Sequence, residues 1–189
     1  MDEINPVETR ILEAPGISLD DFERDPPWRH DSQPIERQSR QDIIDGVTAV
    51  PLMPHADPRG SLCELLTTRE GPIDPIVHVY TVSAAPGSVR AWVYHRFQRD
   101  RLAFTNGDFE IVLYDLRPGS RTRNHLNVFR LGDAQPCLLA IPALVIHGVK
   151  NAGATVAYFI NMPTRVYYPD APDKSRIPEN DLRIPYSFA

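Results

Sequence analysis

Short runs of β-branched and aromatic residues, interleaved with polar ones, cover the chain from Val47 onward. We predict ten strands there: Val47–Leu52, Ser61–Thr67, Ile76–Ser83, Val89–His95, Leu102–Thr105, Phe109–Leu116, Leu126–Leu131, Cys137–Ile141, Val145–Val149 and Thr155–Asn161. Turn-forming residues separate the runs, as at 57–60, 85–87 and 117–120. Many short strands at roughly 8–12-residue spacing are typical of an all-β sandwich or barrel.

One connection carries a stronger local signal than the others. Asn106 and Gly107 lie between two apolar runs. This dipeptide favours a type I′ turn, whose two central residues both need positive φ. We therefore predict a β-hairpin at this point.

The first 46 residues follow a different pattern, with five prolines, many charges and few apolar runs. Only Ile35–Asp45, which ends before Gly46, could form a short helix. We expect residues 1–46 to be an irregular extension that lies over the core or is partly disordered. Residues 47–189 then form one barrel, and the proline- and tyrosine-rich tail from Pro163 onward wraps around it.

Composition narrows the classes of protein that fit this pattern. Of 189 residues, 42% are hydrophobic and 24% charged, which is an ordinary globular balance. The 19 prolines disfavour a helix bundle, and no apolar run approaches the ~20 residues that span a bilayer. The net charge of −5 disfavours a nucleic-acid-binding role. The two isolated cysteines and the absence of an apolar leader in the first residues favour the cytoplasm.

Two segments fit the motifs of a cupin barrel, in which alternate side chains face one internal ligand site. The first runs from Val89 to His95 and on to the glycine at 107. The second has Pro142, then His147 five residues later and Asn151 four residues after that. We expect His147 to face the lumen.

The wider pattern resembles the dTDP-4-dehydrorhamnose 3,5-epimerase family. Residues 57–64 resemble its D-x-R-G-x-F-x-E signature, with Leu62 in place of Phe. Residues 90–95 lie where that family has R-G-L-H-Y-Q, residues 114–122 resemble V-D-L-R-x-x-S-P-T, and residues 141–148 resemble I-P-x-G-x-A-H-G.

The resemblance covers about three quarters of the chain. It implies an all-β cupin jelly-roll barrel, a homodimer, no metal or other cofactor, and a nucleotide-linked 4-keto sugar as the small-molecule ligand. It also implies ligand-binding roles for Arg59, Glu64, Arg90 and His147, with the two arginines suited to clamp a diphosphate.

The family's three catalytic groups are replaced in this chain. Val93 takes the place of the base histidine, Asn161 that of a tyrosine, and Asp100 that of a lysine. Two hypotheses follow. In the first, the base moved two residues along the strand, because alternate side chains share a face. His95, His147, Tyr158 and Arg101 then form a displaced catalytic set. In the second, epimerase chemistry was lost, and the barrel binds a sugar nucleotide, performs another reaction, or only scaffolds a partner.

Other chemistries find less support in the sequence. A metal site would have only His95, His147 and a weak third ligand from Gln98 or Asp100, fewer than usual for a cupin, so we expect no metal. No G-x-S-x-G nucleophile motif and no phosphate-binding P-loop occur in the chain.

Overall fold

A computed structural model describes residues 43–69 and 71–188. It contains twelve strands and, within those residues, no helix: β1 (Thr48–Pro51), β2 (His55–Asp57), β3 (Gly60–Leu62), β4 (Tyr80–Ala84), β5 (Val89–His95), β6 (Asp100–Phe104), β7 (Asp108–Asp115), β8 (Leu126–Gly132), β9 (Cys137–Ile141), β10 (Val145–Asn151), β11 (Ala157–Asn161) and β12 (Lys174–Arg176). The predicted all-β jelly roll is confirmed. None of the described segments is a helix long and apolar enough to cross a membrane.

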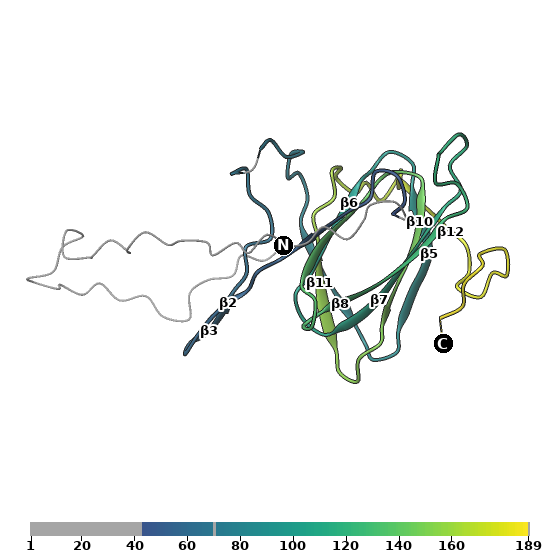
Figure 1. The fold of residues 1–189 in the computed structure, drawn as a ribbon. Helices are drawn as coiled ribbons and strands as arrows, with labels where there is room; N and C mark the ends of the chain where they lie inside the picture. Colours follow the sequence, from purple (N-terminus) through teal and green to yellow (C-terminus); the bar gives the residue numbers. More distant parts are fainter. Residues whose placement is uncertain (1–42, 70, 189) are drawn as a thin grey trace, which may run out of the picture. The chain divides into compact units, whose positions relative to one another are not determined.

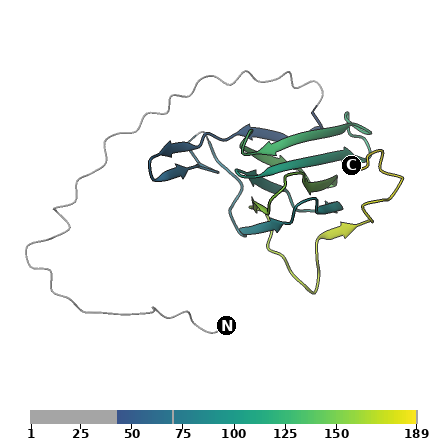
Figure 2. The same cartoon turned by 90° about the horizontal axis from the view of Figure 1, so that it is seen from below.

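Ten strands form two five-stranded antiparallel sheets that face each other (Figures 1 and 2). One sheet has the order β1-β9-β6-β11-β4, and the other has the order β12-β5-β10-β7-β8. Alternation along each strand turns one set of side chains inward. The core between the sheets is aromatic and aliphatic, with Phe104, Phe109 and Phe159 in mutual ring contact.

The two outer faces are covered by non-barrel segments. Leu65 and Leu66 pack over the β6 and β9 side of the first sheet, against Ala103 and Leu138. The C-terminal tail covers the second sheet, where Ile184, Tyr186 and Phe188 pack on Trp92 and Val112. Short strand β12 in this tail pairs with β5, so the tail also extends that sheet.

The hairpin predicted at Asn106-Gly107 is wrong. Gly107 has a positive φ of 72°, but β6 and β7 belong to different sheets, so the turn carries the chain across the barrel. A side chain at Gly107 would approach Ala157 Cβ to 2.3 Å. Glycine is required there by the close crossing as well as by its φ.

Strand boundaries follow the sequence pattern closely in the centre of the barrel and poorly at its edge. Val89–His95 and Cys137–Ile141 agree residue for residue, whereas the predicted strands at 61–67 and 76–83 shorten to β3 and β4. Strands β2 and β12 have three residues each and no apolar alternation. Of the predicted extension, the described residues 43–46 include Ile44, which is buried in the core. The helix predicted over Ile35–Asp45 lies almost entirely outside the described residues.

Candidate active site at the end of the barrel

The site is built where β5 and β10 lie side by side. Val93 is directly opposite His147 in the antiparallel ladder, so their side chains share a face. His95 lies two residues further along β5 and therefore points the same way. The two imidazole rings stack, with centroids 5.9 Å apart and planes 25° apart.

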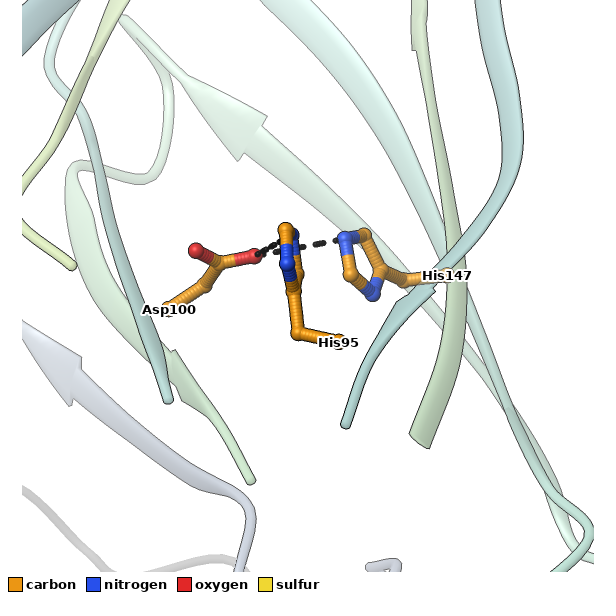
Figure 3. A group of neighbouring side chains, drawn as sticks. All are labelled: His95, Asp100 and His147. Atoms are coloured by element: carbon orange, nitrogen blue, oxygen red, sulfur yellow. Dashed lines mark ion pairs between the residues drawn. The ribbon is translucent and has the colours of Figure 1, made fainter. Parts of the chain in front are cut away.

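A carboxylate from the opposite sheet completes the cluster. Asp100 is the first residue of β6, where it shares the inward face with Leu102 and Phe104. Its Oδ2 lies 3.3 Å from His95 Nε2 and 3.4 Å from His147 Nε2. Figure 3 shows both rings turned toward this one oxygen. The cluster therefore joins the two sheets through three side chains.

Asp100 is ionised although its side chain is only 3% exposed. Burial alone would raise the pKa of its carboxyl group, but the interactions with His147 and His95 outweigh that effect and hold the pKa well below its usual value. Its other oxygen, Oδ1, accepts hydrogen bonds from Gln98 Nε2 at 2.7 Å and Asn161 Nδ2 at 3.1 Å. The carboxylate is thus fixed in orientation from both sides.

The outer nitrogen of each imidazole is held by the backbone. His95 Nδ1 lies 3.0 Å from the carbonyl oxygen of Asp173, and His147 Nδ1 lies 3.2 Å from that of Val145. A carbonyl oxygen can only accept, so Nδ1 is the donor in both contacts. Asp173 also accepts from the backbone N–H groups of residues 96, 97 and 98, which ties the loop after β5 to the tail.

A pocket of about 570 Å³ opens next to His95. Its size falls in the range of small-molecule sites. The pKa of Lys174, a residue in the pocket wall, is lowered mainly by burial and further by the positive charge of Arg176. Arg96 and Arg165 lie over the exposed ring of Phe97. The lining residues are His78, Tyr80, His95, Arg96, Phe97, Gln98, Pro163, Arg165, Val166, Tyr167, Tyr168, Ala171, Pro172, Asp173, Lys174 and Ser175.

The structure brings together only half of the displaced catalytic set. His95 and His147 are neighbours in the cluster, but Tyr158 is 49% exposed on β11 and Arg101 faces away from the lumen. The Arg101 guanidinium donates to the carbonyl oxygens of Met162, Asp74 and Pro75, at 2.7–3.0 Å. Its place on β6 explains this, because residues one apart on a strand point to opposite faces.

The three predicted ligand-binding residues on other elements do not line this pocket. Arg59 lies in the β2–β3 turn with a 91% exposed side chain paired to Asp57. Glu64 forms an ion pair with Arg69, and Arg90 donates to the Ser83 carbonyl oxygen at 3.0 Å. Within one chain, His147 alone of the four predicted ligand-binding residues lies in the cluster.

Two side chains of the candidate site had no clear signal in the sequence. Asp100 stood out only as a weak candidate ligand, because nothing local shows which histidines a strand from the opposite sheet will meet. Asn161 stood out only as the replacement of a tyrosine. Its Nδ2 bonds both Asp100 and the Tyr80 hydroxyl, and its buried Oδ1 has no hydrogen-bond partner in the described part of the chain.

Known proteins resemble both the sequence and this architecture, although no family model matches the chain. The spore coat polysaccharide biosynthesis protein SpsL of Bacillus subtilis (strain 168) is 37% identical over 146 residues, which cover 77% of this chain and 97% of SpsL. The probable low-salt glycan biosynthesis epimerase Agl13 of Haloferax volcanii is 36% identical over 138 residues, or 71% of this chain and 88% of Agl13.

A solved structure supports the same assignment. The dTDP sugar isomerase from Desulfovibrio desulfuricans G20 superposes with a TM-score of 0.71 at 26% identity, over 76% of this chain and 91% of the isomerase. The sequence relatives and the fold agree with one another. The chain therefore belongs to the dTDP-4-dehydrorhamnose 3,5-epimerase family of cupins, a family of sugar-nucleotide epimerases and isomerases.

Proposed function

We propose that this protein isomerises a nucleotide-linked 4-keto sugar at a carbon next to the ketone, with the His95–Asp100–His147 cluster as its reaction centre. The observation that carries the proposal is the position of the cluster. It lies on the lumen face beside Val93 and borders a pocket through His95. The names of the relatives, a glycan epimerase and a dTDP sugar isomerase, support this substrate class.

The chemistry explains why a polar cluster is needed here. Removal of a proton next to a ketone places negative charge on the ketone oxygen. The reaction needs a proton acceptor and a positive or hydrogen-bond-donating environment for that charge. Val93 supplies neither, because its side chain is aliphatic. The displaced centre two residues along β5, about 6.8 Å away, faces a different part of a bound sugar ring.

This displacement predicts a changed exchange pattern. In heavy water, with a dTDP-linked 4-keto-6-deoxy sugar, we expect solvent deuterium to enter at one of the two carbons that flank the ketone. NMR of the sugar protons measures the exchange. The His95→Ala variant should exchange at background rate, while His125→Ala, which removes an exposed histidine on the β7–β8 connection, should match the unaltered protein.

Two outcomes would contradict the proposal. Rapid exchange at both carbons would show that the loss of the histidine at position 93 did not change the reaction. No exchange at either carbon, with the folded protein saturated by the sugar nucleotide, would support the non-catalytic hypothesis instead.

We further propose that the active form is a homodimer. The β2–β3 hairpin projects away from the barrel in both views (Figures 1 and 2). All six of its strand residues are exposed. An isolated two-stranded hairpin is marginal in water. Leu62 on this hairpin and Val50 on the edge strand β1 expose apolar side chains that a second copy would cover. Such pairing would bring Arg59 near the partner's ligand.

A further inference from the structure

The arrangement of the cluster's nitrogen and oxygen atoms differs from that of ordinary hydrogen bonds. The Nε2–Oδ2 distances of 3.3 and 3.4 Å exceed the 2.7–2.9 Å of a charge-assisted N–H···O bond. One ligand atom from each residue can be chosen so that all three lie within 4.8 Å of one another. A point about 2.0–2.4 Å from all three then exists, close to the bond lengths of zinc to histidine nitrogen and carboxylate oxygen.

The tautomer of each histidine favours a cation at that point. Both Nδ1 atoms donate to backbone carbonyls, so a neutral imidazole presents the lone pair of Nε2 to the Asp100 oxygen. One divalent cation satisfies all three atoms while both rings stay neutral.

The surroundings have the form of the outer shell of a metal site. Ligating histidines almost always donate their second ring N–H to a carbonyl or carboxylate, and ligating carboxylates are themselves hydrogen-bonded. Here Gln98 and Asn161 hold Oδ1 of Asp100, which leaves Oδ2 for the ion. The unpaired Oδ1 of Asn161, in a side chain only 5% exposed, is a buried acceptor that a water or ligand would complete.

We infer that His95, Asp100 and His147 bind one divalent first-row transition metal ion, through two imidazole Nε2 atoms and one carboxylate oxygen. Three protein ligands leave coordination positions open, as in catalytic sites, and His95 borders the pocket on that side. Bound there, the ion would polarise a ketone oxygen as a Lewis acid, and the proton would pass to a pocket group other than the three ligands, of which Lys174 has a lowered pKa. This catalytic role rests on the proposed function, whereas metal binding itself does not.

The test is a binding measurement on the full-length protein, stripped with a chelator and titrated with Co²⁺ and, in a separate calorimetric experiment, Zn²⁺. We expect one ion per chain and a visible Co²⁺ absorption band. Affinity should fall at least 100-fold in His95→Ala, Asp100→Ala and His147→Ala and 10–100-fold in Asn161→Ala, as for outer-shell changes elsewhere. The matched control His125→Ala should bind like the unaltered protein.

A second measurement keeps the inference testable where a cluster variant fails to fold. Pulsed EPR of the unaltered protein loaded with Cu²⁺ should show the remote nitrogens of two imidazoles. Failure of the unaltered protein to bind Co²⁺ or Zn²⁺ stoichiometrically would overturn the inference, as would binding that survives all three substitutions in folded proteins. Deuterium exchange by metal-free protein would overturn the catalytic role of the ion and leave the proposed function standing. Metal binding without any exchange would overturn the proposed function, and with it the catalytic role of the ion, and would leave the metal site itself standing.

Discussion

At the scale of single residues, two buried carboxylates, Asp100 and Asp115, hold together the elements around them. Asp100 joins the two sheets at the proposed reaction centre, and Asp115 performs a structural task at the end of β7. Both are nearly inaccessible to water, and both stay ionised because donors surround them. Buried charge of this kind is tolerated only where every lone pair finds a partner.

Asp115 gives a prediction about stability. It accepts hydrogen bonds from Arg117, Ser120 and Thr122 at 2.6–2.9 Å, and its side chain has no exposed surface. Asp115→Asn removes the charge that pairs Arg117, so we expect the free energy of unfolding to fall by about 2–4 kcal/mol. Urea denaturation measures the change. Asp170→Asn, at an exposed position, should stay within about 0.5 kcal/mol.

The same residue makes the protein acid-sensitive. Burial would raise the pKa of the Asp115 carboxyl group, but the bonds from Arg117, Ser120 and Thr122 hold it below its usual value. A carboxyl with a lowered folded-state pKa contributes stability above its unfolded value of about 4, and that contribution is lost as pH falls toward the folded value. The stability gap between the unaltered protein and Asp115→Asn should therefore narrow below about pH 4. A gap that stays constant from pH 7 to pH 3 would contradict this account.

At the scale of elements, strand alternation determines which side chains can do chemistry. Neighbouring residues Asp100 and Arg101 on β6 point to opposite faces, one into the cluster and one toward the segment at 74–75. Arg101 is thus a tether between the outer side of β6 and the segment that leads to the pocket residues His78 and Tyr80.

Arg101→Met tests this tether. The guanidinium donates to three carbonyl oxygens, and its loss leaves them without that partner. We expect the free energy of unfolding to fall by about 2–3 kcal/mol. Hydrogen exchange by mass spectrometry should show faster exchange at residues 72–78 than elsewhere. Arg99→Met is the control, because Arg99 is half-exposed and its ion pair with Asp74 is long, at 3.7 Å. Equal effects of the two substitutions would argue against a tether.

At the scale of the whole molecule, the C-terminal tail covers the outer face of one sheet, whereas apolar side chains are exposed beside the edge of the other sheet. The tail covers the outer face of the β5–β10 sheet with aromatic packing. Beside the opposite sheet, β1 and the β2–β3 hairpin leave apolar side chains in solvent. Exposed apolar groups on a strand edge are typical of a surface that another chain covers.

Light scattering on the full-length protein tests the homodimer. We expect twice the mass of one chain, and a shift toward the single-chain mass for Leu62→Asp, because a buried carboxylate in an apolar interface is costly. Leu182→Asp offers a matched control, since Leu182 is 97% exposed in the tail and Leu62 is 68% exposed on the hairpin. A monomeric full-length protein would remove both the dimer and the cross-subunit role of Arg59.

The sequence by itself determined the fold class and the central strands. Periodicity is a local property, so Val89–His95 and Cys137–Ile141 could be read directly from it. The motifs also marked His95 and His147 as inward-facing candidates, because alternation along one strand fixes their side.

Only the tertiary structure decided which residues meet. The turn at Asn106-Gly107 has the residues of a hairpin turn, yet β6 and β7 lie in opposite sheets. The connection at 96–99 also joins strands of opposite sheets, so Asp100 at the start of β6 meets His95 and His147, and alternation along β6 turns Arg101 away from them. Local sequence sets the face on which a side chain lies, but packing between sheets sets its partners. The proposed reaction centre is a contact between sheets, so its third member became evident only in the folded barrel.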